Sequence, residues 1–126
     1  MKFAKWVFLL AGIYGVLVLV PLYFRESAIG QDYPPLITHP EYFYGFIGTA
    51  LACQFVFLLI ATDPRRYRLM MLPAIAEKAA FAVPVPILYM QQRVPLITFS
   101  FSLVDVVLGL LFVSAFLATR GTSGQD

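Results

Sequence analysis

Four long apolar blocks, separated by short polar stretches, set the pattern of this 126-residue chain. Each block approaches or exceeds the roughly 20 residues that an α-helix needs to cross the hydrocarbon core of a bilayer. The pattern predicts helices over residues 4–24, 40–62, 66–90 and 95–118. We therefore expect an all-α fold, a membrane-embedded bundle of four transmembrane helices that forms a single domain over residues 1–126.

The polar stretches between the blocks contain residues that favour turns and helix ends. Residues 25–39 form the long polar loop, which includes Gly30 and other turn formers. His39 is expected to cap the second helix, and Pro40 fits its first position. The polar residues 120–126 predict a short flexible tail after the last helix.

The third block is the least regular, because it contains three prolines. Pro73 leaves two alternatives open: a short interfacial helix ends before it, or one long helix is kinked at it. Pro84 and Pro86 remove backbone hydrogen bonds and should loosen the outer half of the same helix.

The amino-acid composition and the net charge exclude several kinds of function. Hydrophobic residues make up 60% of the chain, more than soluble domains contain, and they are concentrated in the blocks. The net charge of +2 is too small to suggest nucleic-acid binding. The only cysteine, Cys53, and the only histidine, His39, exclude an intrachain disulfide, a cysteine metal cluster and a bis-histidine haem site within one subunit. We expect neither a metal nor a cofactor.

Basic residues predict the orientation. Arg65, Arg66 and Arg68 cluster between the second and third helices. With four helices, six basic residues lie on the side of both termini and only two, Arg25 and Arg93, on the other. The positive-inside rule then predicts a multi-pass protein of a bacterial inner membrane with both termini in the cytoplasm. We expect the three arginines to orient the chain and to contact anionic lipid headgroups, at about 1 kcal/mol each.

Polar residues inside the blocks are the candidate functional residues. Glu77 and Lys78 lie in the third block, Asp105 and Ser102 in the fourth, and Gln54 in the second. A charge at mid-bilayer costs about 2.5–3.5 kcal/mol, so such residues need a partner and often mark a functional site. An amide such as Gln54 also needs a hydrogen-bond partner there.

Helix geometry predicts that these residues share one site. Ser102 and Asp105 lie on one polar face of the fourth helix, which should point into the bundle. Gln54 and Glu77 fall at similar depth, and Asp105 lies about 7 Å further out. Glu77 and Lys78 project about 100° apart and are not expected to face each other. We expect a ligand-binding site of Glu77, Asp105, Gln54, Lys78 and Ser102, with at least one carboxyl protonated or paired with Lys78.

The chain also shows a family resemblance. The stretches HPEYFYGF at 39–46, DPRRYR at 63–68 and LPAIAEK at 72–78, with the Asp105 helix, resemble a group of small uncharacterised bacterial four-helix membrane proteins. In size and acidic interior the chain is more distantly similar to the EXPERA and DoxX-like four-helix groups. Only the helix count and buried carboxylates match there, so no residue role is carried over.

Three functions remain open at this stage. The first is a pocket for a hydrophobic or lipid-like small molecule, with Glu77 and Asp105 as polar groups and walls such as Phe81, Phe101 and Phe112. The second is an accessory or assembly subunit whose polar core is structural and whose partner is a larger membrane complex. The third is a proton-coupled transporter, which would have to be a homo-oligomer. Whether the protein is an enzyme stays open.

Overall fold

The computed structural model describes residues 2–121, which are helical and contain no β-strand. Four segments are long and apolar enough to cross a membrane, which confirms the all-α helical bundle. Residues 122–126 of the predicted tail lie outside the described part. In chain order the elements are α1 (Lys2–Leu19), η1 (Val20–Phe24), α2 (Glu26–Asp32), α3 (Pro40–Thr62), η2 (Arg68–Met70), α4 (Met71–Ala82), α5 (Pro84–Met90) and α6 (Leu96–Ala118).

The third membrane segment follows neither alternative for Pro73. A turn over residues 64–67 and the short helix η2 lead into α4, which begins at Met71. Pro73 therefore lies in the first turn of α4, where its missing N–H would have had no partner within the helix. The break comes later, at Val83, and α5 begins at Pro84. The prediction that these prolines loosen the outer half is confirmed.

The prediction of a long loop over residues 25–39 is wrong in part, because residues 26–32 form helix α2. Its first turn carries Glu26, which accepts a 3.0 Å hydrogen bond from the Tyr44 hydroxyl of α3. The chain then folds back over Gly30, where a Cβ atom would lie 3.1 Å from Leu36 Cα. Gly30 was predicted to form a turn; in the structure its missing side chain lets the backbone at Leu36 pack closely against it.

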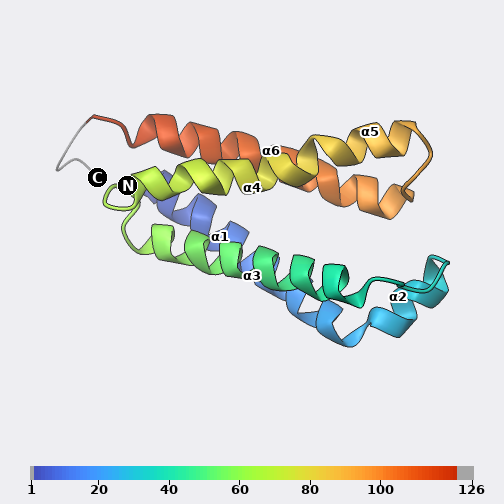
Figure 1. The fold of residues 1–126 in the computed structure, drawn as a ribbon. Coiled ribbons are helices and arrows are strands. Elements are labelled where there is room, and N and C mark those ends of the chain that lie inside the picture. Colours follow the sequence, from blue (N-terminus) through green and yellow to red (C-terminus); the bar gives the residue numbers. More distant parts are fainter. Residues whose placement is uncertain (1, 122–126) are drawn as a thin grey trace.

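The long helices pair into two hairpins (Figure 1). Helix α1 packs mainly against α3, and α4 packs mainly against α6. The start of α1 and the end of α6 lie at the same end of the molecule, which we call the inner end. Towards the opposite, outer end the two hairpins diverge.

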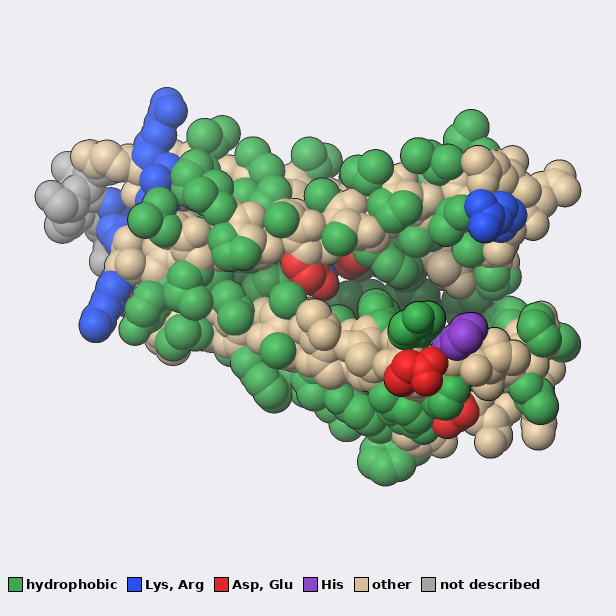
Figure 2. Space-filling model, in the orientation of Figure 1, with side chains coloured by type: hydrophobic (Ala, Val, Ile, Leu, Met, Phe, Trp, Pro, Cys, Tyr) green, Lys and Arg blue, Asp and Glu red, His purple; other side chains and the backbone are tan. Residues whose placement is uncertain are grey.

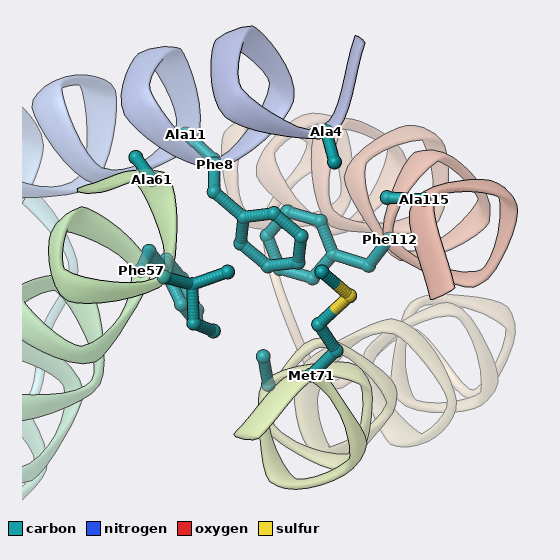
Figure 3. Packing of buried hydrophobic residues seen from close by; sticks show 10 residues of the cluster. Ala4, Phe8, Ala11, Phe57, Ala61, Met71, Phe112 and Ala115 are labelled. Atoms are coloured by element: carbon teal, nitrogen blue, oxygen red, sulfur yellow. The ribbon is translucent and has the colours of Figure 1, made fainter. Parts of the chain in front are cut away.

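An aromatic core joins the hairpins near the inner end (Figure 3). Phe8 of α1 stacks on Phe112 of α6 at 4.3 Å between ring centroids, and Phe57 of α3 meets both rings edge-on at 6.1 and 5.0 Å. All three side chains are fully buried, and Met71 of α4 closes the cluster. Offset and edge-on aromatic pairs contribute about 0.5–1.5 kcal/mol each beyond their buried area. This core fixes the four helices in the inner half.

No comparable core joins the hairpins among the described residues of the outer half. The second buried cluster contains Leu19, Ile47 and Ala50 and lies within the α1–α3 hairpin. On the other hairpin, Tyr89 of α5 stacks on Phe99 of α6 at 4.3 Å. In the outer half, the side chains of these clusters pack within their own hairpin, and space remains between the two hairpins.

Candidate ligand-binding groove and its ion cluster

A lysine ammonium lies between two carboxylates in the middle of the bundle. Lys78 Nζ is 3.5 Å from Glu77 Oε2 and 3.5 Å from Asp105 Oδ1, and it donates a hydrogen bond to the latter. The Lys78 side chain is 5% exposed, whereas Glu77 and Asp105 are 21% and 17% exposed. These three residues form what we call the ion cluster, which ties α4 to α6.

The ion cluster corrects the expectation that Glu77 and Lys78 do not meet, and it shows that Lys78 pairs with carboxylates. Glu77 and Lys78 were expected not to face each other, but the long lysine side chain curves so that its ammonium reaches the neighbouring carboxylate. The same length spans the axial offset to Asp105, so Lys78 points into the bundle and not to the membrane surface. Pairing with both carboxylates reduces the cost of placing charge at this depth.

Residues on α3 and α6 complete the surroundings of Lys78. Its ammonium lies 5.2 Å from the centroid of the Phe57 ring, within the range of a cation–π contact. A Cβ atom on Gly109 would lie 3.5 Å from Lys78 Cβ, so α4 passes close to α6 at this glycine. Ser102 is fully buried one turn before Asp105, as its face predicted, but its hydroxyl donates to Phe99 O of its own helix at 2.6 Å.

Gln54 is buried but does not hydrogen-bond to the ion cluster. Its Nε2 donates to Ala50 O at 2.8 Å, within α3. Its Oε1 accepts no hydrogen bond from any described residue and lies directly against Gly15 of α1. The amide thus packs in the α1–α3 contact, where Gly15 leaves the space for it, and a ligand site that Gln54 shares with the ion cluster stays a prediction.

A groove runs along the outer side of the ion cluster, between α3 and α4, with a volume of about 560 Å³. Figure 2 shows this hollow between the two hairpins, with acidic side chains beside it. Small residues at every fourth position of α3, namely Gly45, Thr49 and Cys53, leave the space open. From α3 the lining residues are Glu41, Tyr42, Gly45, Phe46, Thr49, Ala50 and Cys53, and from α4 they are Glu77, Ala80 and Phe81.

Glu77 is the link between the groove and the ion cluster. It lines the groove, and its buried Oε2 accepts no hydrogen bond from the described residues, although Lys78 Nζ lies 3.5 Å away. Asp105 does not line the groove. Of the expected apolar walls, Phe81 lines it, whereas Phe112 belongs to the aromatic core and Phe101 is 40% exposed.

The three clustered arginines have different surroundings. Arg68 reaches the end of α6, where it contacts Phe116 and the buried Thr119 hydroxyl. Arg66 is exposed, its backbone N–H donates to Asp63 Oδ1 at 3.3 Å, and its guanidinium lies 5.4 Å from the Tyr67 ring centroid. Arg65 is partly buried. A role in orientation and lipid contact stays a prediction for all three, but Arg68 also has a structural role that sequence reasoning missed.

The groove was not predicted from the sequence, although one pattern in α3 marks it. The i, i+4 series Glu41, Gly45, Thr49 and Cys53 marks one face of α3 with small or polar side chains in an otherwise bulky helix.

Within residues 2–121, no three His, Cys, Asp or Glu side chains are grouped so that they could hold a metal ion. Comparison of the chain with family models, curated proteins and solved structures found no match.

Proposed function

We propose that this protein binds a hydrophobic, lipid-like small molecule within the membrane, in the groove between α3 and α4. The observation that carries the proposal is Glu77, an acidic residue deep in the molecule that lines an otherwise largely apolar groove and pairs with Lys78 through its buried Oε2. Ligand sites in proteins combine mostly apolar walls with a few polar groups that fix orientation.

The size of the groove supports this proposal. Its volume of about 560 Å³ falls within the range of about 300–1,000 Å³ that is typical of small-molecule sites. Along α3 it extends from Glu41 to Cys53, about 18 Å of helix. A single alkyl chain with a small polar head fits these dimensions, with the head at Glu77 and the chain towards the outer end.

The two carboxylates of the ion cluster then have separate roles. The Lys78–Asp105 contact joins α4 to α6 and is structural. Glu77 shares the same lysine from the groove side and is the group that contacts the ligand. The accessory-subunit hypothesis explains the first contact, but it gives no role to the groove.

We further propose that the protein lies in a bacterial inner membrane with both termini in the cytoplasm. Six basic residues belong to the inner end of the bundle, which is rich in blue side chains in Figure 2. Arg25 and Arg93 belong to the outer end. In this orientation the ligand groove faces the outer leaflet, and a ligand enters it sideways from the bilayer.

The test is ligand-dependent thermal stability in detergent, with single-chain alcohols, amines and acids as probes. We expect at least one probe to raise the melting temperature of the wild-type protein. Ala80→Trp should abolish that shift, because Ala80 lines the groove and the indole would fill it. Ala79→Trp is the matched control, since Ala79 is exposed on the same helix but does not line the groove. Equal shifts in the two variants, or none in the wild type, would contradict the proposal.

A further inference from the structure

We infer that the ligand head is a protonated amine that carries at least one N–H, so that the protein selects amines over alcohols, acids and quaternary ammonium groups. This inference rests on the proposed function, because it concerns the same groove. It names the chemical class that the ion cluster would recognise.

The first argument is the balance of charge. The ion cluster contains two carboxylates and one ammonium, so with all three groups ionised it carries one excess negative charge. The Phe57 ring, whose centroid lies 5.2 Å from the ammonium, supplies no formal charge. A cationic head beside Glu77 would neutralise the excess charge in a region of low dielectric, where an unbalanced charge is costly.

The second argument is the hydrogen-bonding capacity of the Glu77 carboxylate. Lys78 donates its hydrogen bond to Asp105 Oδ1 and pairs with Glu77 Oε2 at 3.5 Å. Because Oε2 is buried beside Lys78, the oxygen that a ligand in the groove would reach is the other one, Oε1. A primary, secondary or tertiary ammonium can supply both the charge and the N–H. A quaternary ammonium supplies only the charge, and an alcohol supplies only a neutral donor. Charge-assisted hydrogen bonds are roughly twice as strong as neutral ones.

The third argument is the nature of the remaining walls. Besides Glu77, the inner part of the groove is formed by small or apolar side chains such as Ala50, Cys53, Ala80 and Phe81. Within the described lining there is no basic residue to pair with an acidic head. A carboxylate ligand would therefore face Glu77 with like charge.

The experiment compares probes that share one alkyl chain and differ only in the head: tetradecylamine, tetradecyltrimethylammonium, tetradecanol and tetradecanoate. Dissociation constants are measured from thermal stabilisation in a neutral maltoside detergent at constant salt. The groove-filled Ala80→Trp protein reports any effect of the probes on the micelle alone. We expect tetradecylamine to bind about tenfold more tightly than tetradecanol and tetradecyltrimethylammonium, and tetradecanoate not to bind.

Two variants assign the preference to one carboxylate. Glu77→Gln should abolish the amine-to-alcohol preference, because the neutral amide offers the ammonium no opposite charge. Glu41→Gln, which removes an exposed carboxylate at the outer end of the same groove, should keep the preference. The inference is overturned if alcohol or quaternary ammonium matches the amine, or if Glu77→Gln retains the preference. If no probe binds the wild type more than Ala80→Trp, the proposed function itself fails.

Discussion

The guanidinium of Arg68 closes the end of α6 by holding the carbonyl oxygen of Phe116. Its Nε and Nη2 atoms donate to that oxygen at 3.1 and 2.8 Å, and its Cζ atom lies 3.8 Å from the centroid of the Phe116 ring. Carbonyls in the last turn of a helix have no partner within the helix, so an arginine from another element can satisfy them. This contact therefore holds η2, which follows α3, against the end of α6.

Arg68→Lys should therefore destabilise the protein, although it keeps the charge. A lysine can neither donate twice to one carbonyl in this geometry nor stack its head on the ring. We expect a loss of about 1–2 kcal/mol in the free energy of unfolding, measured by denaturation in detergent. Arg66→Lys is the control and should change stability by less than about 0.5 kcal/mol, since Arg66 is exposed and uses its backbone N–H towards Asp63. Equal effects of the two changes would refute this role of Arg68.

The contact between Gly15 and Gln54 gives a second prediction. A Cβ atom at Gly15 would overlap the Gln54 amide, so Gly15→Ala should lower the free energy of unfolding by about 1–3 kcal/mol despite the better helix propensity of alanine. Gly45→Ala should be neutral or stabilising, because its Cβ would meet no atom within 4 Å. In a Gln54→Ala background the cost of Gly15→Ala should largely disappear. An unchanged cost in that background would show that the amide is not the obstacle.

The ion cluster gives a third prediction, on stability. Lys78→Met should lower the free energy of unfolding by about 3 kcal/mol, because it leaves two carboxylates without their buried cation. Glu77→Gln should be neutral or stabilising, because it removes the excess negative charge and keeps the Lys78–Asp105 contact. Chemical denaturation of both variants in one detergent checks the contrast. The assigned roles would be wrong if Glu77→Gln were as damaging as Lys78→Met.

The proposed orientation can be tested by cysteine labelling in intact cells, in a Cys53→Ala background. Ser27 of α2 is exposed near the outer end, and Thr62 is exposed at the inner end of α3. We expect Ser27→Cys to react with a membrane-impermeant maleimide from outside, and Thr62→Cys to react only after the cells are opened. The reverse pattern would place the termini outside.

The sequence was sufficient to predict the four membrane segments, because hydrophobic length and helix-starting prolines are local signals. Pro40 begins α3 as its position indicated, and the polar face of the last helix turns inward at Ser102 and Asp105. The pairing of Lys78 with a carboxyl was expected, but the sequence did not show which carboxyl it would reach; the structure places it beside both. These features depend on helix geometry and burial, which one sequence encodes directly.

The features that the sequence did not reveal depend on side-chain conformation and on which helices pair. The 100° rule argued against a Glu77–Lys78 contact, but it describes the Cβ directions and not the reach of a lysine. The contact of the Gln54 amide with Gly15 was not predicted, because it depends on how closely α1 packs on α3. The groove arises because the hairpins diverge, and no local pattern specifies that angle.

The most direct measurement of the central claim is the location of a bound amphiphile. A tetradecanol analogue with a diazirine at the chain end would be photo-crosslinked to the protein in detergent and mapped by mass spectrometry. We predict that crosslinks concentrate on the α3 and α4 residues that line the groove, and that they disappear in Ala80→Trp but not in Ala79→Trp. Crosslinks spread evenly over the outward faces of the four membrane segments, and unchanged by Ala80→Trp, would contradict the claim that this groove is a ligand site.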